Sequence, residues 1–199
     1  MTQSQNKSLG LILLEDVRIA FAHGLWTASQ VQGQGKPAFS ASFLFPKGHK
    51  QFGALEKALG EVATAKWGAK GNEVLKSLIA GGRVCLRDGN SKPDISGYAG
   101  NWFISARSAA QPLIIDGQRN VLTQASGKPY SGCYVNARLS LWAQDNAYGK
   151  RINAQLTGVQ FLRDGEPLSG GGAASVEDFG EVESSAQAGA EFENSLFGT

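Results

Sequence analysis

Alternating apolar and polar residues predict a chain built mainly from β-strands. In residues 39–45, Phe39, Ala41 and Phe43 alternate with serines, and Pro46 ends the pattern. Within residues 9–26 the alternation is partial, and its apolar side consists of Val17, Ile19, Phe21 and Leu25. Further strands are predicted at 83–87, 98–107, 112–116, 133–142 and 152–161.

The clearest strand pattern lies in residues 133–142, where the two sides differ in polarity. One side is apolar and consists of Cys133, Val135, Ala137, Leu139 and Leu141. The other side carries Tyr134, Asn136, Arg138, Ser140 and Trp142. After a turn at 146–149 the next strand alternates again as far as Gly158, where we expect a bulge that switches the inward side.

Two segments with helical spacing lie between the predicted strands. In residues 50–66 the apolar positions recur every three or four residues, and residues 71–80 form a second short helix that ends at Gly81. The remaining pattern is mostly antiparallel β, which fits a small closed barrel. The predicted fold is therefore mainly β: an OB-fold-like antiparallel barrel with a helical insertion between strands.

The length of 199 residues suits one domain that buries its own core without a disulfide or a metal. Two cysteines are too few for a disulfide scaffold. The first ten residues do not form a signal-peptide pattern, and the apolar run at 11–14 is far too short to span a membrane. We therefore expect a cytoplasmic protein with no membrane partner.

The charges are distributed very unevenly along the chain. Residues 1–163 contain all 19 basic residues and nine of the 17 acidic ones, whereas residues 164–199 contain eight acidic residues and no lysine or arginine. A basic body followed by an acidic tail is typical of proteins that bind nucleic acids. The alternative is a basic domain with a tail that only increases solubility.

The acidic segment 169–199 is rich in glycine, alanine and serine and is expected to be a flexible, disordered tail. Residues 1–168 would then form the folded domain. Near the end of the tail, Phe192, Leu196 and Phe197 are apolar residues in a polar segment, and they are candidates for docking a partner protein. The alternative is a spacer in which these apolar residues are incidental.

No arrangement of residues supports catalysis, a cofactor or a metal site. The pair Gly35-Lys36 lacks the upstream glycine and the following serine or threonine of a phosphate-binding loop. The two histidines and two cysteines are scattered, without the paired spacing of metal ligands. We therefore predict a protein that is not an enzyme and that uses no cofactor.

The polar side of the strand at 133–142 is the first candidate binding surface. Aromatic rings spaced along a strand beside a guanidinium can stack unpaired bases and contact phosphates. The candidate residues are Tyr134, Asn136, Arg138 and Trp142. The alternative is that this side is also buried, although burial of an unpaired arginine is costly.

A second candidate surface lies on the strand at 98–107. Phe103 and Arg107 share one side, and Tyr98 is expected at the rim of the barrel. Burial of Phe103 in the core is the alternative, and Trp26 beside the 30–37 loop is weighed equally between core and stacking roles. The basic residues near these strands would supply a positively charged groove, and they are Arg83, Arg87, Lys92, Lys150 and Arg151.

Three segments, taken in order, resemble a family of phage single-stranded-DNA-binding proteins. They are Gly-Tyr-Ala-Gly-Asn-Trp-Phe at 97–103, Gly-Cys-Tyr-Val-Asn-Ala at 132–137 and Ile-Asn-Ala-Gln-Leu-Thr-Gly-Val-Gln at 152–160. The resemblance covers roughly residues 10–180. It implies an OB-fold that binds single-stranded DNA without sequence preference during phage replication or recombination. It also implies an acidic tail that modulates DNA binding and recruits replication proteins, although here Gly198 and Thr199 follow Phe197.

The resulting hypothesis is a non-catalytic single-stranded-DNA-binding protein of the phage-infected host cell. Its basic side chains would release counterions from phosphates, its aromatic rings would stack bases, and its tail would compete with DNA for the basic groove. Two alternatives stay open, which are an RNA-binding or annealing protein and a protein-interaction or virion adaptor module. The sequence also leaves the oligomeric state open, including a homo-oligomer.

Overall fold

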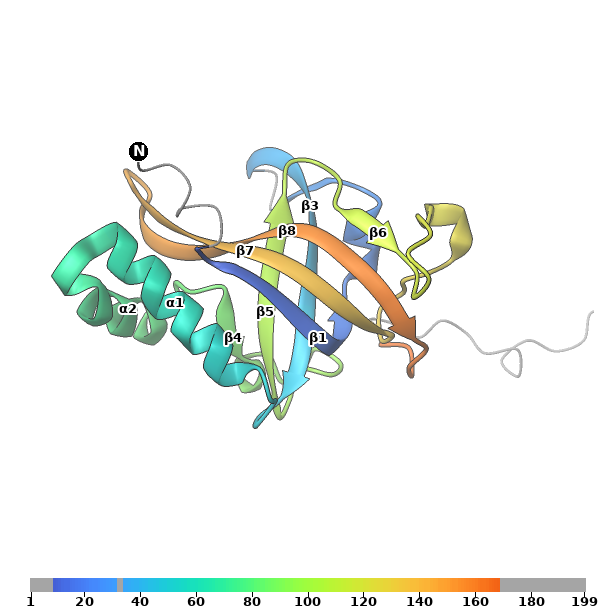
Figure 1. Ribbon diagram of the computed structural model, residues 1–199, viewed down its shortest axis with the longest axis horizontal. Helices are drawn as coiled ribbons and strands as arrows, with labels where there is room; N and C mark the ends of the chain where they lie inside the picture. Colours follow the sequence, from blue (N-terminus) through green and yellow to red (C-terminus); the bar gives the residue numbers. More distant parts are fainter. Residues whose placement is uncertain (1–8, 32–33, 169–199) are drawn as a thin grey trace, which may run out of the picture.

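A computed structural model of the protein describes residues 9–31 and 34–168 (Figure 1). Its long strands are β1 (Leu11–Ala20), β3 (Gln34–Pro46), β5 (Asn101–Ser108), β7 (Tyr134–Asn146) and β8 (Gly149–Arg163). Its short strands are β2 (Ser29–Val31), β4 (Leu86–Asp88) and β6 (Leu113–Ile115), and its helices are α1 (Phe52–Trp67) and α2 (Gly71–Ala80). The expected tail, with Phe192, Leu196 and Phe197, lies outside the described residues.

Within the described residues, five long strands pair in a closed ring. β3 pairs with β1, β1 with β7, β7 with β8, β8 with β5, and β5 with β3 again. A closed five-stranded ring of this kind is the architecture of an OB-type barrel, so the predicted fold class is confirmed. Most pairs are antiparallel, as the sequence predicts, but the β5–β8 and β6–β8 pairs are parallel, and the sequence pattern did not identify these two.

The alternation in β7 decides which side of the barrel wall faces inward. Val135, Ala137 and Leu139 are buried, as the sequence predicts. Between Arg138 and Leu139 of β7, the pairing with β8 shifts by one residue. The extra residue is Thr157 of β8, which has no partner in β7. This irregularity is the bulge expected at Gly158, and beyond it the inward positions change parity.

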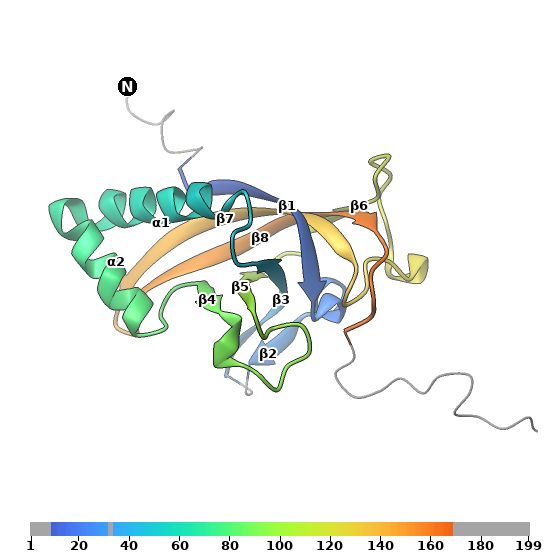
Figure 2. The same ribbon diagram turned by 90° about the horizontal axis from the view of Figure 1, so that it is seen from below.

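Helices α1 and α2 cover one end of the barrel (Figure 2). The buried side of α1 consists of Leu55, Leu59, Val62 and Ala63, spaced at helical intervals. The corner between the helices is tight, because a Cβ atom on Gly71 would lie 2.7 Å from the backbone nitrogen of Thr64. The insertion therefore follows the sequence prediction and closes the barrel over its hydrophobic interior.

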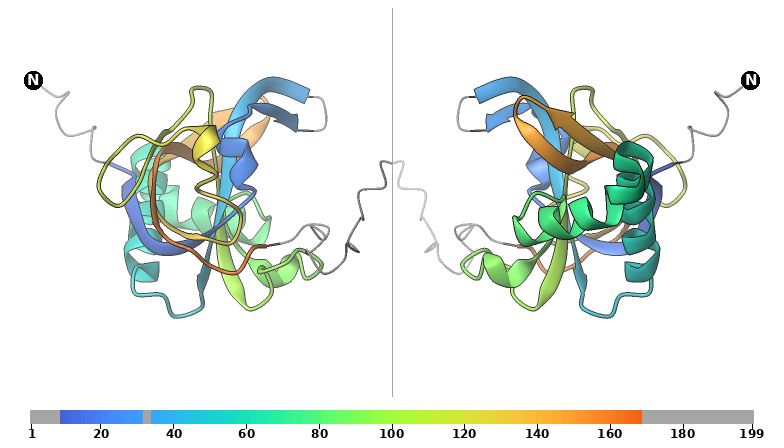
Figure 3. Two further views of the ribbon diagram at one scale, coloured as in Figure 1. Left: turned by 90° about the vertical axis from the view of Figure 1, so that its right-hand side faces the viewer. Right: turned by 90° about the vertical axis from the view of Figure 1, so that its left-hand side faces the viewer.

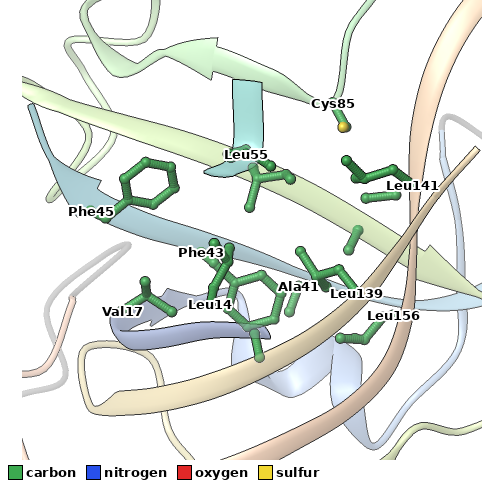
Figure 4. Close-up of a cluster of buried hydrophobic side chains, with 14 of the residues drawn as sticks. Leu14, Val17, Ala41, Phe43, Phe45, Leu55, Cys85, Leu139, Leu141 and Leu156 are labelled. Atoms are coloured by element: carbon green, nitrogen blue, oxygen red, sulfur yellow. The ribbon is translucent and has the colours of Figure 1, made fainter. Parts of the chain in front are cut away.

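The core combines side chains from the barrel strands and from α1 (Figure 4). Phe43, Leu55 and Leu139 are fully buried there. Both cysteines are free and buried. Burial raises the pKa of the Cys85 thiol to about 12 and that of Cys133 to about 11, so both behave as small apolar residues.

The end of the first strand differs from the prediction. β1 ends at Ala20, and a short 3-10 helix follows at Ala22–Leu25. Phe21 between them has a left-handed backbone with φ 58° and is 55% exposed, so it does not continue the apolar side of the strand. The chain changes direction at Phe21, so the alternation of inward and outward residues ends with the strand. Leu25 in the 3-10 helix is nevertheless buried in the core.

Candidate nucleic-acid interface

A polar groove of about 340 Å³ runs over β4, β5 and the adjoining ends of β7 and β8. Its wall carries four arginines from three segments of the chain, which are Arg83 and Arg87 before and in β4, Arg107 in β5 and Arg151 in β8. Trp142 contributes an aromatic ring, and Gln144 and Asn153 contribute amides. Five of the residues predicted from the sequence therefore lie together in one groove.

Strand alternation positions these side chains. In β5, Ile104 and Ala106 face the core, so Ser105 and Arg107 face the groove. In β8, burial of Ile152 likewise turns Arg151 outward. The two strands lie side by side, because Arg107 is the register partner of Gln155 in the short parallel contact between them.

The groove is strongly electropositive. Among its lining residues there is no aspartate or glutamate, and within the described part of the chain none of its four arginines forms an ion pair. The Nε atom of Arg87 is buried and has no hydrogen-bond partner there. Four guanidinium groups without a neighbouring carboxylate among the lining residues suit the groove to an anionic ligand.

Trp142 is the aromatic residue of the groove that a ligand can reach. Its side chain is 46% exposed, as the outward side of the strand predicts. It is paired across β7–β8 with Asn153, whose amide donates a hydrogen bond of 3.3 Å to Gln144. A half-exposed indole beside guanidinium groups is suited to stacking on an unpaired base.

The turn between β7 and β8 extends the groove at one end. The indole Nε1 of Trp67 donates a hydrogen bond of 2.8 Å to Asp145, which ties the strand pair to α1. The guanidinium Nη1 of Arg83 lies 3.1 Å from the point where a Cβ atom on Gly149 would be. Tyr148 at the tip is 87% exposed and was missed by the sequence analysis, although a tyrosine in a predicted turn was a usable signal.

Lys150 does not line the groove, in contrast to the sequence prediction. Its Nζ atom lies 3.9 Å from Asp145 and 5.9 Å from the ring of Trp67. Lys150 thus contributes to the contact that holds the β7–β8 turn against α1. The neighbouring Arg151 points to the groove instead, because adjacent strand residues face opposite sides.

The expected exposure of Tyr98 and Phe103 was wrong. Both rings are buried, at 1% and 0% exposure, in a second small cluster with Ala20 and Leu44. The loop before β5 folds back over the strand, so the outer side of β5 is covered at this point. Neither ring is available to stack bases, and burial raises the pKa of the Tyr98 hydroxyl.

The two buried rings instead support cations next to the groove. The guanidinium of Arg87 lies 5.0 Å from the centre of the Phe103 ring, and the Lys92 ammonium lies 5.5 Å from it. The Lys92 ammonium is also 5.9 Å from the centre of the Tyr98 ring. Cation–π contacts of this kind restrain the two cations in position.

The other predicted residues of β7 lie away from the groove. The ring of Tyr134 is covered by the guanidinium of Arg163, 3.6 Å from its centre. Asn136 donates a hydrogen bond of 3.0 Å to Gln160 and accepts one of 3.1 Å from the backbone of Asp16. The side chains of Tyr134 and Asn136 are half-buried and contact other residues of the barrel, whereas Arg138 is exposed.

The remaining aromatic candidate is Trp26, at the end of the 3-10 helix that follows β1. Trp26 is partly buried and packs against the main core, which favours the core role over stacking. No group of three or more metal-ligand side chains occurs among the described residues. Over the same residues, no helix is long and apolar enough to cross a lipid bilayer.

The groove occupies the usual ligand side of this architecture. OB-type barrels bind oligonucleotides on the face of their second and third strands, flanked by the loops between strands one and two and between four and five. In this barrel β3 and β5 are the second and third long strands in chain order, and they pair with each other. The ends of β2 and β3 and the β7–β8 turn lie on the same side of the barrel (Figure 3).

Comparison with known proteins identifies the family of this chain. The sequence model of the family described as "Enterobacter phage Enc34, ssDNA-binding protein" matches residues 11–189. The chain belongs to this family. Protein p50 of Acyrthosiphon pisum secondary endosymbiont phage 1 is 44% identical over 174 residues, which covers 86% of this chain and 93% of p50.

Several solved structures resemble the fold described above. The single-stranded DNA-binding protein from bacteriophage Enc34, solved in complex with ssDNA, has a TM-score of 0.67 and 29% identity, covering 82% of this chain and 91% of that one. A C-terminal truncation of the Enc34 protein has a TM-score of 0.64 and 29% identity, covering 81% and 90%. The bacteriophage T7 protein gp2.5 has a TM-score of 0.51 at 10% identity, covering 88% and 96%, and shows the shared fold alone.

Proposed function

We propose that this protein binds single-stranded DNA without sequence preference in the arginine groove. The observation that carries this proposal is the convergence of four arginines, unpaired among the described residues, around an exposed Trp142. Guanidinium groups neutralise backbone phosphates, and the indole stacks on a base of any identity. Membership of the Enc34 family supports the same ligand.

Stacking requires bases that are not paired, so a duplex binds more weakly than a single strand. The protein acts by binding rather than by catalysis, inside the phage-infected cell, where it covers single strands exposed during replication or recombination. The groove offers phosphate contacts from its four guanidinium groups and a stacking surface on Trp142, and neither kind of contact depends on the identity of the base. Binding is therefore strong in its electrostatic part and tolerant of sequence.

The acidic tail is part of the proposed mechanism. Residues 164–199 carry eight acidic residues and no basic ones. Tethered to the domain, they compete with DNA for the groove at an effective concentration in the order of millimolar. DNA displaces them, and the apolar residues Phe192, Leu196 and Phe197 become available to replication or recombination proteins.

The test measures binding of a labelled dT oligomer to the full-length protein by fluorescence anisotropy over a salt series. The double variant Arg107→Gln/Arg151→Gln should bind at least about tenfold more weakly at low salt. Removal of two phosphate contacts should also reduce the slope of log affinity against log salt by about 1.4, from roughly 0.7 for each contact to a single strand.

Arg119→Gln is the matched control, because it removes an exposed arginine that lines neither the groove nor the hollows beside Leu13. Its affinity and salt slope should equal those of the wild type. Equal losses in the control and the double variant, or no loss in either, would contradict the assignment of the groove. A uridine oligomer in the same assay tests whether RNA is the preferred ligand instead.

A further inference from the structure

A second surface, separate from the groove, exposes several leucines around one arginine. Leu11 and Leu13 of β1 are 39% and 48% exposed, and Leu113 of β6 is 56% exposed. Arg138 of β7 lies opposite Leu13 in the strand register. Figure 1 shows β1, β7, β8 and β6 following one another across this face. We call Leu11, Leu13, Leu113 and Arg138 the leucine surface.

The leucine surface is hollowed in two places. One hollow of about 210 Å³ is lined by Leu11, Ile12, Leu13 and Arg138. Another of about 200 Å³ lies between Leu13, Leu113 and Ile115, and Arg138 also lines it. Because the hollows share Leu13 and Arg138, they form one apolar surface with two depressions and a cation between them. Contiguous exposed apolar surface of this kind marks an interaction site.

No residue of the leucine surface lines the arginine groove, so DNA binding there does not explain it. Its charge is also left without a partner among the described residues, since Arg138 forms no ion pair there. The nearby acids are engaged elsewhere: Asp16 pairs with Arg163, and the carboxylate of Asp116 accepts hydrogen bonds from Asn120. The surface is therefore apolar with a positive centre.

We propose that residues 192–197 of the same chain dock on the leucine surface. This segment reads Phe-Glu-Asn-Ser-Leu-Phe, and Glu191 precedes it. Phe192, Leu196 and Phe197 match the two apolar depressions, and Glu191 or Glu193 matches the guanidinium of Arg138. The tail contains no lysine or arginine that would oppose this contact.

The length of the tail allows this contact. Leu168, the last described residue, donates a backbone hydrogen bond of 2.9 Å to Ser131, just before β7. From there to Arg138 the chain advances about 23 Å if fully extended at about 3.3 Å per residue. For a glycine- and serine-rich chain of 24 residues, the distance in sequence from Leu168 to Phe192, the expected root-mean-square span is about 27 Å. Tethering at that length makes even a weak contact effective.

Two other occupants fit less well. A second copy that used the same surface about a two-fold axis would bring two Arg138 side chains together at its centre. The apolar groove between α1 and α2, about 170 Å³ and lined by Leu75 and Ile79, is another potential site for the tail. Glu56 lies in its wall, however, and would repel an acidic segment.

The experiment records backbone amide NMR spectra of the full-length protein without DNA. In the variant Leu13→Ser/Leu113→Ser, the amides of residues 191–197 should move to the positions seen in an isolated peptide of residues 187–199. The charge variant Arg138→Glu should move them in the same direction without altering any apolar contact of the core. Ile79→Ser is the matched control, because Ile79 is equally exposed but lies at the other groove, and it should leave these amides in place.

The reciprocal variant, Phe192→Ala/Phe197→Ala, should shift the amides of Leu11–Leu13 and Leu113–Ile115 and leave those of Arg107 and Arg151 unchanged. The proposal is overturned if the wild-type amides of 191–197 already coincide with those of the peptide. It is also overturned if Ile79→Ser moves them, or if their positions change with protein concentration, which would place the segment on a second copy. Because no DNA is present, failure here is distinguishable from failure of the proposed DNA binding.

Discussion

Trp142 and Phe103 are both aromatic residues on outward-facing positions of long strands, yet they have opposite roles. Phe103 is fully buried under the loop that precedes β5, whereas Trp142 is 46% exposed in the groove. The difference arises from what covers each strand and not from the residue type. At the scale of single residues, exposure therefore separates side chains that can meet DNA from those that support the barrel.

Replacing Trp142 with alanine should weaken binding of a dT oligomer by about tenfold or more. Loss of base stacking costs about 1–3 kcal/mol, and about 1.4 kcal/mol corresponds to a factor of ten in affinity. The thermal midpoint should change little, because the ring is half exposed. Fluorescence anisotropy and a thermal melt of the same sample measure both quantities.

Phe103→Ala serves as the contrasting variant. Its ring is fully buried, so the variant should lose about 3–5 kcal/mol of stability from lost burial and the cavity left behind. A drop in stability for Trp142→Ala with unchanged affinity would instead place Trp142 among the structural residues. Urea unfolding followed by circular dichroism gives the free energies.

The two cysteines provide a prediction that depends on pH. Burial raises the pKa of Cys85 to about 12 and that of Cys133 to about 11, so both thiols stay protonated well above neutral pH in the folded protein. Only the thiolate reacts with iodoacetamide. At pH 8 we expect no alkylation of the native protein by mass spectrometry and complete alkylation of both residues in urea. Rapid modification of native Cys85, on the floor of the groove, would contradict its burial.

At the scale of elements, the contact between Trp67 and Asp145 couples helix α1 to the wall of the groove. The indole hydrogen bond is the direct link between α1 and the end of β7, and Lys150 lies close to both partners. Trp67→Phe keeps most of the apolar ring but removes the donor. A hydrogen bond to a charged group contributes about 1.5–3 kcal/mol, so its loss should loosen the β7–β8 turn.

The expected result is faster amide hydrogen exchange in residues 146–150, by about tenfold or more, with little change in the barrel core. Local opening of the turn should also weaken binding of single-stranded DNA modestly, since Arg83 lies against this turn. Lys57→Gln, on the exposed side of α1, is the control for changes to the helix itself. Unchanged exchange at the turn in Trp67→Phe would show that strand pairing alone holds it.

Many of the strands and helices were predictable from the sequence, because the local spacing of apolar residues indicates both the type of element and its buried side. The inward side of β7, the bulge at Gly158 and the helix at 71–80 all follow from the spacing of apolar residues. The parallel contact between β5 and β8 was not predictable in this way, since it depends on how distant strands meet when the barrel closes. For the same reason, the sequence left burial of Phe103 open as an alternative to a surface role and did not decide between the two.

The candidate site was predicted in part. The arginines of the groove were identified from charge and from their positions near strands, and Trp142 from the outward side of β7. The alternation in the strand at 133–142 predicts that Trp142 and Arg138 share one binding surface, because both lie on the same side of that strand. In the structure they line different hollows, because that side is continuous with the groove at one end of β7 and with the leucine surface further along. The alternation of residues along a strand predicts which side of the sheet a residue faces, but it does not predict which other elements lie beside that residue.

At the scale of the whole molecule, charge is divided between a basic body and an acidic tail. The body up to residue 163 has a net charge of +10, and residues 164–199 have −8. Within the described body, several lysines are paired with acids, but the groove arginines are not. In the proposed competition between the acidic tail and DNA phosphates, the groove is therefore the shared target.

Neutralising the middle of the tail tests this competition in the full-length protein. The variant Glu177→Gln/Asp178→Asn/Glu181→Gln/Glu183→Gln keeps the length and the terminal apolar residues but removes four negative charges. Because the tethered acids no longer compete with phosphates, affinity for a dT oligomer should increase at low salt, and the gain should shrink as salt screens the tail. Deletion of 169–199 should increase affinity further.

Duplex DNA should gain more than single-stranded DNA from the same change. Single strands already displace the tail, since stacking on Trp142 adds to their phosphate contacts, whereas a duplex relies on charge alone. The control variant Ser175→Ala/Ser184→Ala/Ser185→Ala alters the same segment without changing charge and should bind like the wild type. Anisotropy titrations with both DNA forms would reject tail competition if the charge variant and this control gave the same affinities.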